Sequence, residues 1–222
     1  MKVRVTRFLD GARAATGSAV IVDVFRAFTT AAFCIAAGAR EIVLLADHEQ
    51  ALAMKREDAA LFLTGEIGGR PIPGFDAGNS PSVIEHLDLS GRRVVQRTSS
   101  GTQGVVAAER ARAVLLGSFV IAEATVRYLT SRADDVSIVA MGRSATEPSE
   151  EDDACAEYLA RRLAGERPDS GAIVAKLWEH EDPAWPEWFP RRDAVLACEV
   201  DRFDFALPVT REDGLLVARP AR

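Results

Sequence analysis

Short apolar runs alternate with longer amphipathic stretches along most of this sequence, and this alternation is the feature that most constrains its fold. The runs expected to form strands are Ser18–Phe25, Glu41–Ala46, Ala60–Leu63, Arg93–Arg97, Ala113–Leu116 and Val136–Met141. The stretches expected to form helices are Arg26–Gly38, His48–Glu57, Ser80–His86, Thr102–Arg112, Ile121–Ser131 and Glu150–Leu163. Strands that alternate with helices in this way predict parallel β-α-β units, and hence a three-layer α/β/α fold with a mostly parallel sheet.

The C-terminal part of the chain is less regular, but nothing divides the sequence into separate domains. We expect a helix over Gly171–His180, a packed loop over Asp182–Pro190, and late strands at Asp193–Val200 and Leu215–Ala218. The tryptophan-rich loop is expected to close over the core or over a homodimer contact. Because 222 residues can bury one sizeable core, and no repeat or linker interrupts them, we expect a single α/β domain over residues 1–222.

The charge and the apolar content exclude several classes of partner. A net charge of −6 argues against a nucleic-acid-binding surface, which is normally basic. No apolar run reaches the roughly 18 residues of a membrane span, and Met1–Ala15 lacks the apolar segment of a signal peptide. Three sparse cysteines are typical of reduced thiols. We therefore expect a cytoplasmic protein with neither a nucleic-acid nor a membrane partner.

Three familiar kinds of functional site are not expected. Cys34 and Arg40 have the C-x5-R spacing of cysteine-dependent phosphatases, but that thiolate must lie in a strand-to-helix loop, and Cys34 falls inside a predicted helix. The three histidines are scattered without metal-ligand spacing, so zinc is not expected. Neither a Walker motif nor G-x-G-x-x-G is present, so nucleotide cofactors have no support.

Asp23 is the first candidate site residue. It ends the apolar run Ala19–Val22 and precedes a predicted helix. A carboxylate at the end of a buried strand is costly unless solvent, a metal ion or a cation meets it. Because ligands of α/β sheets bind at the carboxyl ends of the strands, Asp23 is expected to face the ligand. The alternative is a helix cap or a structural partner of Arg26.

The loop from Gly65 to Pro81 is the densest candidate segment. It contains the carboxylates Glu66 and Asp76, with glycines that permit close backbone approach. Asn79 and Ser80 can cap the helix that follows, which makes disorder improbable. A long irregular loop of this kind is usually a binding element, and a surface loop without a ligand is the alternative.

Hydroxyl-bearing residues follow the strand Arg93–Arg97. Thr98, Ser99, Ser100, Gly101 and Thr102 lie where a helix is expected to begin. Hydroxyl and N–H donors at a helix N-terminus, next to Arg97, can hold an oxyanion. Helix capping alone is the alternative for these residues.

An acidic cluster follows the last strand of the alternating pattern. After Val136–Met141 come Gly142-Arg143-Ser144 and then Glu150 to Asp153. Acidic residues in a first helical turn are favourable for the helix dipole alone, but four in a row exceed what capping requires. One or two of them are expected to reach the same strand-end crevice as Asp23.

Together these segments resemble the 2-phosphosulfolactate phosphatase family. The segments that carry the resemblance are Val22–Thr30, Gly65-Glu66, Gly74–Pro81, Thr98–Thr102, Gly117-Ser118, Glu151-Asp152 with Cys155-Ala156, and Asp201–Asp204. The element G-F-D-x-G-N-S-P at Gly74–Pro81 is distinctive, and the order and spacing of the other segments agree with the family. The resemblance implies a Mg²⁺-dependent hydrolase of a small acidic phosphomonoester, from a route of coenzyme M biosynthesis.

The resemblance leads to a hypothesis for the site. Magnesium takes oxygen ligands, usually one or two carboxylates, and Asp23, Glu66 and Asp76 are the expected pool. Glu151 or Asp152 is the further ligand or general base, and the nucleophile is water or Asp23 itself. Residues expected to hold phosphate or to stabilise its developing charge are Arg26, Asn79, Ser80, Arg97, Thr98, Ser99, Ser100, Gly101, Thr102 and Arg143.

Three departures from the family pattern affect the substrate rather than the fold. Ile67 stands where an Arg usually follows Gly-Glu, Ser100 replaces an Asn, and Gly142–Ala145 replaces a glycine-rich turn. Arg70 or Arg143 could compensate. A protein of the same fold that binds an anion or a metal without catalysis is the alternative reading.

Overall fold

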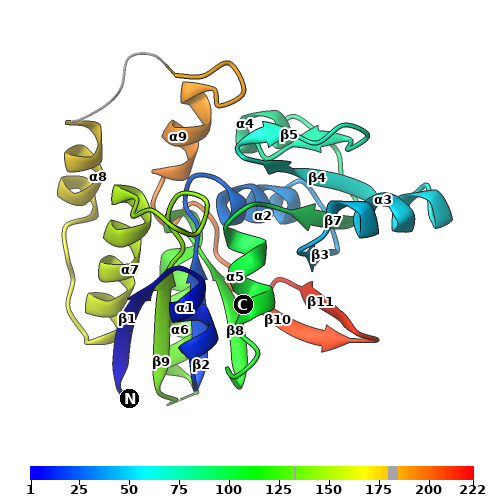
Figure 1. Cartoon of the computed structure of the whole chain (residues 1–222). Coiled ribbons are helices and arrows are strands. Elements are labelled where there is room, and N and C mark those ends of the chain that lie inside the picture. The colour runs from blue at the N-terminus through cyan, green and yellow to red at the C-terminus, as the bar shows by residue number, and fades with distance from the viewer. Residues whose placement is uncertain (133, 180–184) are drawn as a thin grey trace.

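The computed structural model describes residues 1–132, 134–179 and 185–222, and its strands and helices alternate along the chain (Figure 1). The strands are β1 (Val3–Arg7), β2 (Ser18–Val22), β3 (Glu41–Leu45), β4 (Phe62–Ile67), β5 (Arg70–Pro71), β6 (Ala77–Gly78), β7 (Arg93–Arg97), β8 (Ala113–Gly117), β9 (Val136–Ala140), β10 (Leu207–Glu212) and β11 (Leu215–Ala218). The helices are α1 (Phe8–Ala14), α2 (Ala27–Ala36), α3 (His48–Glu57), α4 (Pro81–Ile84), α5 (Gly101–Ala107), α6 (Ala122–Thr130), α7 (Glu150–Leu163), α8 (Ser170–Trp178) and α9 (Arg191–Ala197), with a 3-10 turn at Phe119–Ile121.

The described strands form one 11-stranded sheet, which confirms the predicted single-domain α/β class with a mostly parallel sheet. Its order is β1-β9-β2-β8-β10-β11-β3-β7-β4-β5, with β6 beside β4. The strands β1, β9, β2 and β8 are parallel to one another and form a first half, and β3, β7 and β4 form a second parallel half.

The hairpin β10–β11 joins these two halves. It is antiparallel to β8 on one side and to β3 on the other, so three antiparallel pairings separate the halves. The strands of the first half stand upright in Figure 1, whereas those of the second half lie across them. The sheet therefore turns at the hairpin, and this turn brings the carboxyl ends of the two halves together.

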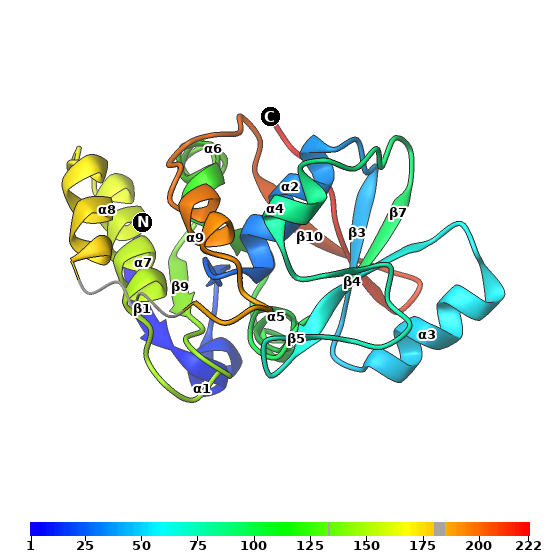
Figure 2. The same ribbon diagram turned by 90° about the horizontal axis from the view of Figure 1, so that it is seen from above.

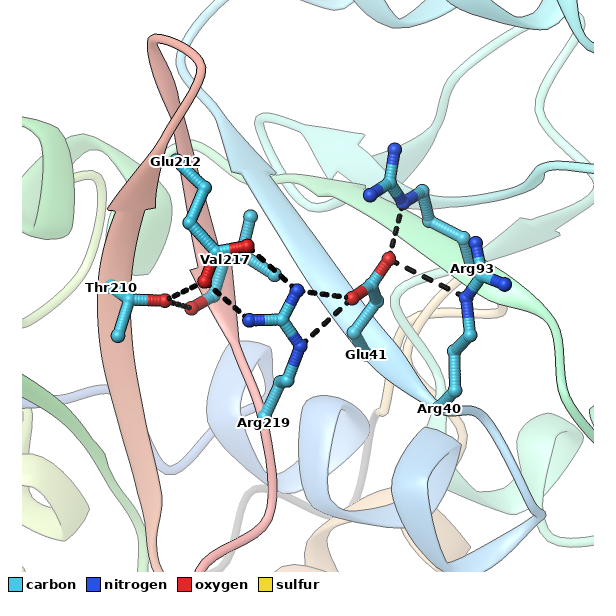
Figure 3. A network of polar contacts seen from close by, with 7 residues as sticks. All are labelled: Arg40, Glu41, Arg93, Thr210, Glu212, Val217 and Arg219. Atoms are coloured by element: carbon cyan, nitrogen blue, oxygen red, sulfur yellow. Dashed lines mark hydrogen bonds and ion pairs between the residues drawn. The ribbon is translucent and has the colours of Figure 1, made fainter.

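A network of charged side chains attaches the hairpin to the second half (Figure 3). Arg219 Nη2 donates to Glu41 Oε2 (2.6 Å) and to Glu212 Oε2 (2.8 Å), and Arg93 donates to the other oxygen of Glu41. Burial alone would raise the pKa of Glu41, but the hydrogen bonds from Arg93 and Arg219 hold it below its ordinary value. The network thus fixes the hairpin at the amino-terminal ends of β3 and β7.

Helices cover both faces of the sheet because each strand buries side chains on both sides. On one face, Ile21 of β2 belongs to an apolar cluster with Phe28 of α2 and Val105 of α5. On the other face, Val20 belongs to a cluster with Leu159 of α7, and α6 contributes to the same cluster. Near-continuous apolar strands such as Ser18–Val22 are what a doubly covered parallel sheet requires.

The structure corrects several predicted elements. Asp193–Val200 is not a strand: Arg191–Ala197 is the helix α9, which buries Asp193, Ala194, Leu196 and Ala197. Three elements were not predicted: the strand β1, the helix α1 and the strand β10. β10 was missed because Pro208 is unusual inside a strand. Gly65–Asn79 is less irregular than predicted, since β4 continues to Ile67.

Two further expectations concern the chain's periphery. Residues 180–184 lie outside the described residues, and they include the end of the predicted helix Gly171–His180 and the first three residues of the predicted loop Asp182–Pro190. Trp185 to Pro190 are described, and they pack as expected, with the rings of Trp185 and Phe189 5.1 Å apart. Across the part of the chain that the structure describes, no helix has both the length and the apolar character that crossing a membrane requires.

Candidate functional site

Asp23 lies at the end of β2, where the two halves of the sheet meet. Its carboxylate Oδ1 accepts a hydrogen bond from the Ala27 N–H at the start of α2 (3.0 Å). The first residue of α5, Gly101, approaches from the other half: a Cβ atom there would lie 2.8 Å from Asp23 Oδ2. The end of β7 and the end of β2 can meet this closely because residue 101 has no side chain.

The pKa of Asp23 is raised to about 7. Burial is the main cause, since only 5% of the residue is exposed, and the nearby carboxylates Glu66 and Glu151 raise the pKa further. Hydrogen bonds from the backbone N–H groups of Ala27 and Gly101 act in the opposite direction. Asp23 is therefore a carboxyl group that changes charge near neutral pH, in surroundings with an excess of negative charge.

Asp152 bridges the ends of β2 and β9 from the first turn of α7. Its Oδ1 accepts from the Val24 N–H (2.7 Å), and its Oδ2 accepts from the Gly142 N–H (2.8 Å). Burial raises the pKa of Asp152, the charges of Asp23 and Glu151 add to this, and the two N–H donors oppose it. These two hydrogen bonds join the end of β2 to the end of β9, so the geometry fits a residue that positions the strand ends.

Glu66 connects the end of β4 to the segment after β7. Its Oε1 accepts from the Ser99 N–H (2.5 Å), and its Oε2 accepts from the Gly69 N–H (2.6 Å) and the Ser99 hydroxyl (3.1 Å). The Ser99 hydroxyl oxygen in turn accepts from the Gly68 N–H (2.9 Å). The donors of Ser99 and Gly69 thus converge on an anionic oxygen, which is the property expected of a phosphate-binding loop.

The segment Thr98–Thr102 caps α5 and also joins the loop after β9. The Thr98 N–H donates to Thr102 Oγ1 (2.8 Å), and the Thr102 N–H donates to Thr98 Oγ1 (3.1 Å), a reciprocal cap. Ser100 Oγ donates to the Gly142 carbonyl (2.6 Å) and accepts from the Ala145 N–H (2.6 Å). Capping, the alternative considered for these residues, is therefore real for the two threonines, while Ser100 fixes the Gly142 loop.

Arg26 is buried and turned toward the C-terminal part of the chain. Its guanidinium donates to Asp193 Oδ2 (2.8 Å), to the Trp188 carbonyl (3.0 Å) and to the Gly69 carbonyl (3.2 Å). The Phe189 ring lies 4.2 Å from its central carbon. Its predicted role in stabilising phosphoryl charge stays a prediction, since these contacts direct its donors to the protein.

The other two arginines and Glu151 are more exposed than Arg26. Arg97 donates to the Ala46 carbonyl (3.0 Å) and to the Glu66 carbonyl (2.9 Å). Arg143 is exposed in the loop after β9, and its charge acts on Glu151. Burial raises the pKa of Glu151, and a hydrogen bond from its own N–H and the charge of Arg143 oppose this. Glu151 is thus a half-buried carboxylate close to Asp23 and Asp152.

Asp76 has partners of its own and is not brought together with Asp23. It forms an ion pair with Lys55 of α3 (2.9 Å), and its Oδ2 accepts from the Leu63 N–H (2.7 Å) at the start of β4. Glu66 lies at the other end of the same strand. The structure therefore brings only Asp23 and Glu66, of the three expected magnesium ligands, into one electrostatic neighbourhood.

Asn79 and Ser80, expected phosphate contacts, are both buried beside α4. The Ser80 hydroxyl donates to Asp193 Oδ1 (2.8 Å). Asn79 Oδ1 is buried and has no hydrogen-bond partner among the described residues. Ser80 is thus part of the Asp193 environment rather than of the Asp23 environment.

The carboxylates near Asp23 do not form a preformed metal cage. Among residues 1–132, 134–179 and 185–222, no three His, Cys, Asp or Glu side chains form a group that could hold a metal ion. The region nevertheless has an excess of negative charge, because four carboxyl groups act on one another there: Asp23, Glu66, Glu151 and Asp152. A hard cation that keeps most of its waters satisfies such a site.

Cys34 and the cavity between α1 and α5 lie outside this arrangement. Cys34 is fully buried in α2, and burial raises the pKa of its thiol, as expected for an inert cysteine. A cavity of about 390 Å³ lies between α1 and α5, at Leu9, Arg13 and Val106. None of the residues that line it belongs to the strand-end site.

Sequence reasoning missed Asp193 and the partner of the segment that precedes it. Asp193 was assigned to a strand, although it is fully buried in α9 and pairs with Arg26, 167 residues away in the sequence. Two aromatic residues next to prolines just before a helix were the available signal, and they indicated packing without indicating a partner. Figure 2 shows α9 beside α4, the element that carries Ser80 and Ser82.

Comparison with known proteins adds an independent finding. The family model described as 2-phosphosulpholactate phosphatase matches residues 7–193. A probable 2-phosphosulfolactate phosphatase of Carboxydothermus hydrogenoformans is 36% identical over 75% of this chain and 69% of its own length. A probable 2-phosphosulfolactate phosphatase of Thermus thermophilus is 40% identical over 70% of this chain and 67% of its own length. The one of Bacillus subtilis is 28% identical over 88% of this chain and 87% of its own length. The matched region includes Asp23, Glu66, Ser99 and Asp152.

Proposed function

This chain belongs to the 2-phosphosulfolactate phosphatase family, and on that premise we propose that it hydrolyses a small acidic phosphomonoester with the help of Mg²⁺. 2-Phosphosulfolactate, cleaved to sulfolactate and phosphate, is the first substrate to test, because the relatives carry that name. A place in coenzyme M biosynthesis would follow from that substrate.

The observation that carries the proposal is the meeting of two opposite features at the strand ends. Asp23, Glu151 and Asp152 supply an excess of negative charge, while the Ser99 and Gly69 donors already hold an anionic oxygen. A phosphoester bound with a divalent cation needs both kinds of group: oxygen ligands for the cation and N–H or O–H donors for the phosphoryl oxygens.

Asp23 and Glu66 are the residues that would hold the magnesium ion. The ion, when bound, supplies Lewis-acid polarisation of the phosphoryl group and lowers the pKa of water. The segment Ser99–Gly101 at the start of α5 would bind the phosphoryl oxygens, helped by the positive end of the helix. Arg97, whose Nη1 already reaches the Glu66 carbonyl, would add positive charge beside them.

The protein's own groups would also place and move the proton. Glu151 would act as the general base, because burial raises its pKa and so makes it a stronger acceptor of a proton than an exposed carboxylate. Asp152, fixed at both oxygens, would hold the ends of β2 and β9 in place. Water, rather than Asp23, is the nucleophile in this proposal.

Exposed arginines offer contacts for a second acidic group on the substrate. Arg143 lies in the loop that Ser100 fixes, and Arg70 lies over the Trp188 ring (5.9 Å) beside the Glu66 turn. Either arginine could take the role of the Arg that the family usually has at the position of Ile67. Substrates with a carboxylate or sulfonate next to the phosphoester are therefore expected to be preferred over neutral ones.

The test is phosphate release from a panel of phosphomonoesters. 2-Phosphosulfolactate, phospholactate, 3-phosphoglycerate and p-nitrophenyl phosphate are each supplied with Mg²⁺ or with EDTA. We expect turnover of the acidic esters with Mg²⁺, lost in Asp23→Asn and Glu151→Gln and kept in Asp10→Asn, whose side chain is exposed. A folded protein that is inert towards the whole panel would establish the non-catalytic alternative instead.

A further inference from the structure

We propose that Asp193 is a positioning residue of the phosphatase site, acting through Arg26 on the turn that orients Glu66. The expected effect on kcat rests on the proposed function. Asp193 itself does not touch the Ser99 or Glu66 groups. Its effect is carried by contacts that run from α9 to the end of β4.

The first step is a buried ion pair between α9 and the end of β2. Asp193 is fully buried, Arg26 is 4% exposed, and Asp193 Oδ2 accepts from Arg26 Nη1 at 2.8 Å. The other oxygen, Oδ1, accepts from the Ser80 hydroxyl (2.8 Å), the Ser82 N–H (3.0 Å) and the Ser82 hydroxyl (2.5 Å). With four donors around it, the carboxylate is fixed and leaves the Arg26 guanidinium one orientation.

The second step is the contact from Arg26 to the Glu66 turn. Arg26 Nη2 donates to the Gly69 carbonyl (3.2 Å), and the Gly69 N–H donates to Glu66 Oε2 (2.6 Å). Glu66 in turn accepts from the Ser99 N–H and hydroxyl. The guanidinium thus holds the Gly69 carbonyl, and the N–H of the same residue holds the Glu66 carboxylate. The orientation of the guanidinium therefore fixes the backbone at Gly69 and, through it, the direction of the Glu66 carboxylate.

The third step is the aromatic cover over this turn. The Trp188 carbonyl accepts from Arg26 Nη1, so the same ion pair holds the segment before α9. The Trp188 ring lies against Gly69 so closely that a Cβ there would be 2.2 Å from the ring. Arg26, Trp188 and Gly69 therefore form one packed unit, and loss of Asp193 frees all three.

A neighbouring ion pair provides a matched control. Arg192, next to Asp193 in α9, pairs with Glu85 directly after α4, and its side chain is 52% exposed. This pair joins the same two parts of the chain but makes no contact with Arg26. An exposed pair of this kind contributes little to stability.

The experiment compares Asp193→Asn, Arg26→Lys and the control Arg192→Gln in the full chain with Mg²⁺. Arg26→Lys keeps a cation for Asp193 but lacks the planar fork that reaches Trp188, Gly69 and Asp193 together. We expect kcat to fall about 10- to 100-fold in both site variants, as for other residues that orient a metal-binding carboxylate, with a smaller change in KM. Arg192→Gln should keep the kcat of the unaltered protein.

Amide hydrogen exchange supplies a readout that does not depend on activity. The Gly69 and Ser99 N–H groups should exchange faster in Arg26→Lys and in Asp193→Asn, while the N–H groups of β9 keep their protection. Unchanged kcat and unchanged Gly69 exchange in a folded Arg26→Lys protein would overturn the proposal, even if Asp193→Asn fails to fold. If the unaltered protein proves inert, the proposed function fails, and the exchange data still decide the positioning role.

Discussion

The raised pKa of Asp23 predicts that replacing this residue should stabilise the metal-free protein while removing its activity. In Asp23→Asn the side chain keeps its shape and one oxygen for the Ala27 N–H, but it cannot ionise. The buried carboxylate of the unaltered protein is costly above neutral pH, where it must carry a charge beside Glu66 and Glu151. The substitution removes that cost.

The size and the sign of the effect follow from the pKa. A rise from an ordinary value of 3.8 to about 7 corresponds to about 4 kcal/mol. Between about pH 4 and pH 7 the folded protein binds a proton that the unfolded chain has released, so stability is present below pH 4 and is lost as pH rises to 7. The loss of the hydrogen bond from Gly101 costs Asp23→Asn about 1–2 kcal/mol at every pH. At pH 8 the net gain is then about 2–3 kcal/mol.

Urea unfolding in EDTA at pH values from 5 to 8 measures this directly. The free energy of unfolding of Asp23→Asn, minus that of the unaltered protein, should grow by about 2–3 kcal/mol across the range. Asp10→Asn, whose partner Arg13 is also exposed, should follow the unaltered protein throughout. Parallel stability curves for Asp23→Asn and the unaltered protein would refute the argument that burial and repulsion control this carboxyl group.

Four further outcomes are expected. Mg²⁺ at about 100 times its dissociation constant should add about 2.7 kcal/mol to the stability of the unaltered protein at pH 8 and little to Asp23→Asn, as measured by thermal shift with and without EDTA. Gly101→Ala places a Cβ 2.8 Å from the Asp23 carboxylate and should lower kcat about 100-fold, whereas Gly171→Ala in the first turn of α8 should not; equal kcat values would contradict the close approach. Ser100→Ala leaves a buried N–H and a buried carbonyl unpaired and should lower stability in urea by about 2 kcal/mol; an unchanged midpoint would contradict it. Asp76→Asn should keep most of the kcat, because its carboxylate is held by Lys55; a loss as large as that of Asp23→Asn would restore Asp76 to the ligand set.

Local patterns along the chain were sufficient to predict most of the fold. The apolar runs Ser18–Phe25 and Val136–Met141 predicted strands, and the structure has strands at Ser18–Val22 and Val136–Ala140 within them. Such runs are recognisable because a buried parallel strand needs side chains that are apolar on both faces. The turn of the sheet at β10–β11 was not predictable in the same way. It depends on ion pairs such as Arg219 with Glu41, whose members lie 178 residues apart.

The site residues that follow strand ends could be predicted from the sequence. Those whose position depends on a distant side-chain partner could not. Asp23, Ser99 and Asp152 follow three strands, and the rule that strand ends face the ligand places them together. Asp76 was predicted as a third ligand from the composition of its loop, and the structure pairs its carboxylate with Lys55 of a neighbouring helix. Asp193 could not be found, since a buried charge is recognisable only from its partner, and Arg26 is distant in the sequence.

The central claim is that Asp23 and Glu66 hold a divalent cation while the start of α5 holds phosphate. A crystal structure with Mn²⁺ in place of Mg²⁺, and with phosphate, tests it most directly, because anomalous scattering locates the metal without ambiguity. The account predicts a single strong peak within oxygen-ligand distance of Asp23, with a phosphate oxygen on the metal and others on the Ser99–Gly101 segment. A peak beside Asp76 and Lys55, or phosphate bound at a different edge of the sheet, would contradict it.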